Sequence, residues 1–165
     1  MPASPIRPAR PADVPAILSI WNPIIRDTAI TFNATEKSEA EVAALISERA
    51  AAGHALLVAE GAGRVIGFGG YGQFRGGVGY GRTMEHTLLF APEARGAGLG
   101  RAMIQALCAH ARETGAHSLI AGVSAENPGG RAFHRATGFA EIATLPEVGF
   151  KFGRYMDLHL MQRML

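Results

Sequence analysis

A glycine-rich segment, Arg95-Gly96-Ala97-Gly98-Leu99-Gly100-Arg101, is the clearest candidate for chemistry in this sequence. It lies between a predicted strand and a predicted helix, where glycines let a ligand approach the backbone closely. The first amide groups of a helix are unpaired and lie at the positive end of its dipole, so the segment predicts a pyrophosphate site. A Walker A loop would end in Gly-Lys-Ser/Thr, and a Rossmann fingerprint would place a glycine at position 101. Neither pattern fits this segment.

Glu85 is the second candidate, because it interrupts an apolar strand shortly before the glycine-rich segment. A carboxylate in such a strand is costly to bury without a purpose. It either takes part in chemistry or pairs with a cation such as an arginine. His86, its neighbour, points to the opposite face of a regular strand and is predicted to be a core or hydrogen-bonded histidine.

The elements that position these residues follow from hydrophobic periodicity and from turn residues. Pro11 and Asp13 open a helix, and Ser38 with Glu41 forms a capping box for the next one. The order β-α-α-β-β-β-α-β-α-β-β predicts one α/β domain over residues 1–165, a mixed sheet with helices on both faces. The predicted strands cover residues 6–8, 55–59, 64–71, 83–90, 118–123, 139–145 and 149–162, and the last two helices cover 99–115 and 127–137.

The pattern Arg95-x-x-Gly98-x-Gly100 resembles the signature of the GNAT superfamily, the Gcn5-related N-acetyltransferases. The block from Asn127 to Phe139 is similar to the asparagine-helix-glycine-aromatic block of that family, and the element order agrees along the chain. The resemblance implies the GNAT fold, a mixed and mostly antiparallel sheet of about seven strands. It also implies acetyl-CoA as co-substrate.

Three further features resemble the phosphinothricin and methionine sulfoximine acetyltransferase branch: residues 83–87, His134, and the tail from Val148 to Asp157. This implies an enzyme that acetylates the α-amino group of a small amino acid or analogue, such as methionine sulfone, by direct attack on the thioester. It also implies a homodimer. Two alternatives stay open: a family member acting on another amine, such as a protein N-terminus or an aminoglycoside, and a non-catalytic acyl-CoA-binding sensor.

The resemblance also implies roles for individual residues. Glu85 is the expected base, often acting through water, although it could instead anchor the substrate ammonium group. His134 stands where many members carry a tyrosine that protonates the leaving thiolate, so it is either that donor or a structural contact. The strand before the glycine-rich segment is usually bulged or splayed. The expected cofactor-binding residues are Leu88, Leu89 and Phe90 through their main chains, Arg95, Gly96, Ala97, Gly98, Leu99, Gly100, Arg101, Asn127 and Arg131.

An amino-acid substrate needs a cation for its carboxylate, and a bidentate arginine contact would orient the amine. Arg75 is the predicted clamp, because Gln73-Phe74-Arg75 matches an aromatic-arginine pair in the branch; Arg82 is a second local candidate. Thr87, Phe32 and Tyr155 complete the expected substrate pocket.

Composition limits the other possibilities. The chain has 165 residues, a formal net charge of +2 and no basic run, so nucleic acid and anionic membrane are unlikely partners. Cys108 is the only cysteine, which excludes an intrachain disulfide and a multi-cysteine metal site. The remaining histidines have no metal-ligand spacing, and no metal is expected. Without a signal-like or membrane-spanning apolar segment, we expect a cytoplasmic protein.

Overall fold

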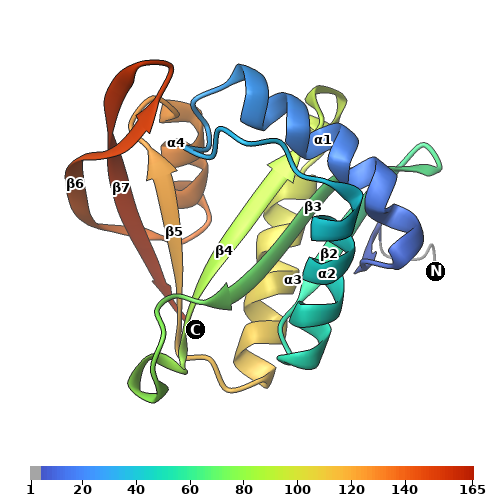
Figure 1. Cartoon of the computed structure of the whole chain (residues 1–165). Coiled ribbons are helices and arrows are strands. Elements are labelled where there is room, and N and C mark those ends of the chain that lie inside the picture. The colour runs from blue at the N-terminus through green and yellow to red at the C-terminus, as the bar shows by residue number, and fades with distance from the viewer. Residues whose placement is uncertain (1–4) are drawn as a thin grey trace.

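The computed structural model describes residues 5–165, and they form one seven-stranded sheet with helices on both faces (Figure 1). The sheet order is β1-β2-β3-β4-β5-β7-β6, with only β4 and β5 parallel. This is the predicted mixed, mostly antiparallel architecture. The strands are β1 Ile6–Pro8, β2 Leu56–Gly61, β3 Arg64–Gln73, β4 Thr83–Phe90, β5 Ser118–Ser124, β6 Ala140–Lys151 and β7 Arg154–Met164.

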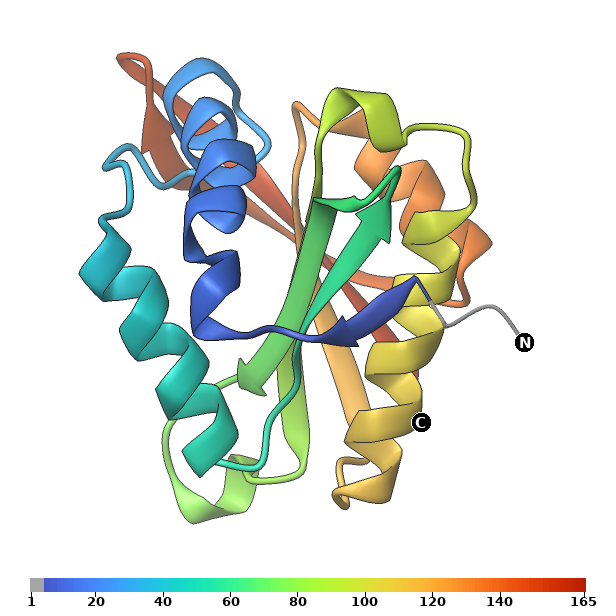
Figure 2. The same cartoon turned by 90° about the vertical axis from the view of Figure 1, so that its right-hand side faces the viewer.

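Four α-helices cover the sheet, two on each face (Figure 2). Residues of α1 and α2, such as Ile17 and Val42, pack with Phe68 of β3 on one face. Met103 and Leu107 of α3 pack on the other face, where α4 also lies. None of the helices in the described chain is long and apolar enough to cross a membrane. Their bounds are α1 Val14–Asp27, α2 Glu39–Ala51, α3 Leu99–Glu113 and α4 Pro128–Ala136.

The parallel strands β4 and β5 separate half-way along their length. They pair only from Thr83 to Glu85 on β4 and from Ser118 to Ile120 on β5. Beyond this point β4 stays paired with β3 and β5 stays paired with β7, so the sheet opens between them (Figure 1). The splayed strand expected from the resemblance is therefore confirmed. Backbone groups on the two inner edges lack a ladder partner and need other hydrogen-bonding groups.

Local sequence signals account for most element boundaries. Ser38 caps α2 by accepting from the amide of Glu41, whose side chain accepts in return from the amide of Ser38. The division of the last two strands was predicted wrongly. The structure turns at Phe152 and Gly153, both with positive φ, so residues 149–151 end β6 instead of beginning β7. Phenylalanine rarely adopts positive φ, so this two-residue turn lacks the usual Asn-Gly signal.

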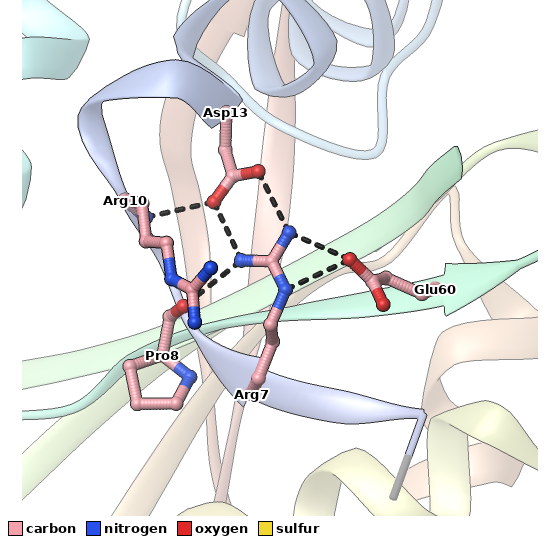
Figure 3. Close-up of polar contacts among 5 residues, drawn as sticks. All are labelled: Arg7, Pro8, Arg10, Asp13 and Glu60. Atoms are coloured by element: carbon pink, nitrogen blue, oxygen red, sulfur yellow. Dashed lines mark hydrogen bonds and ion pairs between the residues drawn. The ribbon is translucent and has the colours of Figure 1, made fainter. Parts of the chain in front are cut away.

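An ion-pair network holds the N-terminal corner together (Figure 3). Arg7 of β1 donates two parallel hydrogen bonds to Asp13, at 2.8 and 2.9 Å, and its Nε donates to Glu60 of β2 at 2.8 Å. Asp13 also accepts from the amide of Arg10 at 2.7 Å. Because Asp13 precedes α1 directly, the network fixes the start of that helix against the edge of the sheet. Paired with Arg7, the carboxyl of Asp13 has a pKa below its usual range.

Candidate active site

A cavity of about 340 Å³ opens where β4 and β5 separate, and we call it the β4–β5 cavity. Its walls come from both strands, from α1, from the segment between α1 and α2, and from α4. The lining includes Trp21, Thr31, Phe32, Glu85, His86, Thr87, Leu88, Leu89, Gly122, Ser124, Asn127, His134 and Leu158.

Glu85 faces this cavity from β4. Its Oε1 lies 3.3 Å from where a Cβ of Gly122 would stand, so it leans across the opening toward β5. Solvent reaches the carboxylate through the cavity mouth, which corrects the expectation of a buried group. The surrounding walls still remove part of its hydration and raise the pKa of the Glu85 carboxyl. Among residues 5–165 it has no ion-pair partner, so it is available to an ammonium group.

His86 and His134 form a buried pair behind Glu85. As predicted, His86 points away from Glu85, and its Nε2 lies 3.1 Å from Nε2 of His134. The Nδ1 of His134 donates to the carbonyl of Gly130 at 2.7 Å, which leaves Nε2 as the acceptor in the neutral ring. His86 must then be the donor in the contact between the two rings. Its Nδ1 is buried and has no hydrogen-bond partner among residues 5–165.

Burial keeps both rings neutral at neutral pH. Desolvation lowers the pKa of His86 to about 3, with a smaller contribution from His134. Desolvation also lowers the pKa of His134. Phe139 packs against both rings, with centroids 5.5 and 5.1 Å away. The pair is therefore a neutral hydrogen-bonded unit that reaches the cavity wall.

The glycine-rich turn between β4 and α3 has the geometry of an anion site. Gly96 and Gly98 have φ of 79° and 73°, and nothing lies within 4 Å of the position that a Cβ would take at either residue. These two glycines are thus explained by backbone conformation. Gly100 differs, because a Cβ there would lie 3.0 Å from the ring of Phe133 on α4. Its role is to allow α3 and α4 to pack closely.

The start of α3 presents free donors at this turn. Ala102 is the first residue whose amide pairs with the preceding turn, donating to the carbonyl of Gly98 at 3.2 Å. The amides of Leu99, Gly100 and Arg101 therefore point outward without a backbone acceptor. A pyrophosphate fits this arrangement, since it supplies acceptor oxygens and negative charge at the positive end of the helix.

Several expected cofactor residues have structural partners. The side chain of Asn127 caps α4 by accepting from the amide of Gly130 at 2.9 Å, and it also lines the cavity. Arg131 pairs with Glu141 of β6. Arg101 donates to the carbonyl of Ala136 at 3.1 Å. Leu88 and Leu89 line the cavity on the unpaired half of β4.

The expected substrate residues divide into two groups. Thr87 and Phe32 line the β4–β5 cavity, and the Phe32 ring packs over Gly149. Arg75 lies in the exposed loop after β3, with its guanidinium 5.7 Å from the ring centroid of Tyr80. Tyr155 is 66% exposed on the β6–β7 hairpin. Neither lines a cavity that Glu85 also lines.

Sequence reasoning missed Arg49, which lines a second cavity beside Glu85. This cavity, of about 250 Å³, lies between α2 and β3, and we call it the α2–β3 cavity. It shares Trp21, Glu85 and Thr87 with the β4–β5 cavity. No local motif marks Arg49, because it ends an ordinary amphipathic helix far from Glu85 in the sequence.

Cys108 and the other histidines offer no competing site. Cys108 is 3% exposed within the core packed against α3, and burial raises the pKa of its thiol. Within the described residues no cluster of histidine, cysteine, aspartate or glutamate could hold a metal ion.

Comparison with known proteins decides the family. The sequence profile of the acetyltransferase (GNAT) family matches residues 20–139. The chain belongs to this family. It is an N-acetyltransferase that uses acetyl-CoA, in agreement with the turn before α3 and the opening between β4 and β5.

Curated relatives cover nearly the whole chain. An L-methionine sulfoximine/L-methionine sulfone acetyltransferase of Pseudomonas aeruginosa is 39% identical over 95% of this chain and 92% of its own length. An L-amino acid N-acyltransferase of Escherichia coli is 37% identical, over 97% of this chain and 93% of that protein. A phosphinothricin N-acetyltransferase of Alcaligenes faecalis is 34% identical, over 99% and 83%.

Solved structures agree with this family assignment. A structure described as a ribosomal-protein-alanine N-acetyltransferase from Brucella melitensis has a TM-score of 0.93 and 41% identity, over 97% of this chain and 99% of that one. An acetyltransferase from Salmonella typhimurium, solved with acetyl-CoA, has a TM-score of 0.93 and 36% identity, over 97% and 92%. The acetyl-CoA bound in that neighbour matches the co-substrate of the family.

Proposed function

We propose that this N-acetyltransferase acts on the α-amino group of a small amino acid or analogue of the methionine sulfone, methionine sulfoximine or phosphinothricin type. The observation that carries the proposal is Glu85, which has no ion-pair partner among residues 5–165 and lines a small cavity where β4 and β5 separate. A cavity of about 340 Å³ suits a small zwitterion better than a polycation. The names of the three curated relatives support the same substrate class.

In this proposal Glu85 interacts with the amino group of the substrate. Acetyl-CoA supplies the activated acetyl thioester, and the chain must bring a neutral amine to it. The pKa of Glu85, raised by desolvation, makes its carboxylate a better proton acceptor than an ordinary glutamate. Glu85 could accept the proton directly or through water, or it could anchor the ammonium group. Each of these roles requires the same orientation of the side chain.

Main-chain groups on the unpaired half of β4 bind the co-substrate in this proposal. The amides and carbonyls of Leu88, Leu89 and Phe90 that face β5 have no ladder partner there. They bind the pantetheine arm and the acetyl carbonyl in this proposal, while the amides at the start of α3 bind the pyrophosphate. Asn127 contributes its free amide nitrogen, since its oxygen caps α4.

The proton-donor role of His134 stays a prediction. The contact with His86 determines which protonation state of His134 this role requires. In the neutral pair Nε2 of His134 accepts from His86. Release of a proton from Nε2 of His134 requires that ring to be protonated first and to donate toward His86 or the cavity. His86 would then carry its own proton on Nδ1, the nitrogen that now has no partner.

A homodimer is the second part of the proposal, and exposed apolar side chains support it. The β6–β7 hairpin exposes Val148, Phe150, Phe152 and Tyr155, at 55%, 58%, 52% and 66%. β6 is also an edge strand of the sheet. The rings of Phe150 and Tyr155 also pack against each other, with centroids 5.0 Å apart, and exposed apolar side chains that cluster in this way are typical of a protein interface. Light scattering should give the mass of two chains, and Phe150→Ser should shift it toward one.

A thiol-release assay with acetyl-CoA tests the substrate class. The panel contains methionine sulfone, methionine sulfoximine, phosphinothricin, the proteinogenic amino acids, an aminoglycoside and a peptide with an N-terminal alanine. We expect the highest kcat/KM for one of the amino-acid analogues. The Brucella structure gives protein N-terminal alanine as the second candidate, which preferred acetylation of the peptide would favour. Binding of acetyl-CoA without any thiol release would favour a non-catalytic sensor.

A further inference from the structure

Arg49 places a guanidinium group directly beside Glu85. Gly72 of β3 is the cross-strand partner of Glu85, so side chains at the two positions share one face of the sheet. Gly72 has no side chain, and a Cβ there would collide with the Arg49 guanidinium. The end of α2 thus delivers a cation into the space that a side chain at position 72 would fill.

This guanidinium has no hydrogen-bond or ion-pair partner in the part of the chain that the structure describes. Among residues 5–165, Arg49 makes no ion pair and its side chain makes no hydrogen bond. Glu85 does not pair with it, because that carboxylate leans toward Gly122 on the opposite side. The N–H donors of this half-buried guanidinium are therefore available to a ligand that enters the cavity.

The space between the two charges is the α2–β3 cavity, which both side chains line. Lys37 also lines it but has other contacts, with Glu41 at 3.6 Å and with the ring of Trp21 at 5.8 Å. Arg75, the clamp predicted from the sequence, lies outside this cavity. Arg49 is therefore the unpaired cation that shares a cavity wall with Glu85 in the described chain.

We propose that Arg49 binds an oxygen-bearing group of the amino-acid substrate whose amine faces Glu85. The group carries at least two acceptor atoms, oxygen or imine nitrogen, on one central atom, which suits the planar fork of a guanidinium. The substrate offers two such sources, its α-carboxylate and the sulfone, sulfoximine or phosphinate at the end of its side chain. Opposite charges on either side of a cavity select a zwitterion of defined length. The inference rests on the proposed function and adds the residue that would determine its specificity.

The test compares Arg49→Ala and Arg49→Lys with wild type, using acetyl-CoA and methionine sulfone. Loss of a charge-assisted contact should raise KM for methionine sulfone about 10- to 150-fold in Arg49→Ala. KM for acetyl-CoA should not change, and Arg49→Lys should recover part of the loss. Arg112→Ala, an exposed arginine at the end of α3, is the matched control and should behave as wild type.

Substrate variants identify the group that Arg49 binds. If it is the α-carboxylate, the α-carboxamide of methionine sulfone is a poor substrate for wild type, and Arg49→Ala causes no further loss. If it is the sulfone, methionine, which lacks the sulfone oxygens, is the poor substrate for wild type, and Arg49→Ala causes no further loss with methionine. Either coupling supports the inference, and Arg49→Lys gives the same comparison if Arg49→Ala folds poorly.

Three outcomes overturn the inference. One is an unchanged KM for methionine sulfone in a folded Arg49→Ala protein that remains active. Another is an equal rise of KM for both substrates, which indicates a structural role. A wild-type protein that acetylates no amino acid in the panel overturns the proposed function itself. The first two leave the proposed function intact, so the two failures are distinguishable.

Discussion

Arg7 and Arg49 are both half-buried, yet they lie in opposite chemical settings. Arg7 is held by Asp13 through two parallel hydrogen bonds and by Glu60 through a third. Arg49 lies over Gly72 without a partner in the described chain, next to a carboxylate that is also unpaired. One region satisfies its charges internally, and the other presents them to a cavity.

In our proposal, the difference separates groups that maintain the fold from groups that bind a ligand. Paired charges in the N-terminal corner lower the free energy of the folded state only if both partners are present. Unpaired groups at the cavity contribute little to folding and remain free to bind. Substitutions in the N-terminal corner should therefore change the free energy of unfolding but not the kinetic constants. Substitutions at the cavity should change the kinetic constants with little effect on stability.

The largest effect is expected from Glu85→Gln. The variant keeps the shape of the side chain but loses the charge that accepts a proton, so kcat should fall about 10²- to 10⁴-fold. Partial recovery is expected at high pH, where the free amine becomes abundant. A pH-rate profile with saturating acetyl-CoA measures both effects.

The same profile distinguishes the two roles of Glu85. A rise of KM with nearly unchanged kcat would assign it to anchoring the ammonium group. Glu48→Gln, on the exposed side of α2, is the control and should match wild type. Wild-type constants in Glu85→Gln would remove this residue from the active site.

Asp13→Ala tests the other side of the comparison. Removing one partner leaves Arg7 half-buried without its main acceptor, so the free energy of unfolding should fall by about 2–3 kcal/mol, between the values for surface and buried pairs. Denaturant titration at pH 7 measures the change, and KM for both substrates should stay at the wild-type value. Asp27→Ala, which breaks only the exposed pair with Arg26, should leave stability nearly unchanged. A kinetic defect in Asp13→Ala would contradict the separation of the two regions.

The buried histidine pair should make stability depend on pH. The folded state disfavours protonation of His86, whose pKa is lowered to about 3, whereas the unfolded chain takes up the proton near pH 6.5. The unfolded state therefore binds more protons below pH 6.5, and stability should decrease by about 1.4 kcal/mol for each pH unit below that value. Denaturant titrations between pH 7 and pH 5 measure the slope. His86→Asn should flatten it, and an identical slope in that variant would contradict the assignment.

Gly98→Ala should have a small effect on stability. Its φ of 73° is unfavourable for other residues, so Gly98→Ala should lower the free energy of unfolding by about 1 kcal/mol. Binding of coenzyme A should persist in this variant, because nothing lies within 4 Å of the added Cβ. Gly98→Glu carries the same strain plus a negative charge at the start of α3, and it should bind coenzyme A much more weakly. Equal calorimetric affinities of the two variants would place the pyrophosphate elsewhere.

Much of the fold was predictable from local patterns. Alternation along residues 83–90 places Glu85 and His86 on opposite faces, as the structure has them. The capping box at Ser38 and the glycines before α3 mark helix starts. The β6–β7 turn was not predictable, because Phe152 adopts a backbone conformation that its side chain does not favour. Pairing of Lys151 with Arg154 leaves a two-residue turn, and such a turn requires positive φ at both positions whatever residues occupy them.

The sequence by itself determined the family, the glycine-rich turn before α3 and the carboxylate on β4, since each is carried by contiguous residues of defined type. Only the tertiary structure decided which cation stands beside that carboxylate. Arg75 is close to Glu85 along the chain but lies in an exposed loop, whereas Arg49 reaches Gly72 because α2 packs across the face of β3. The contact between His86 and His134 likewise depends on α4 packing behind β4. Periodicity tells which face a side chain takes, but the partner across that face is set by the packing of elements that are distant in sequence.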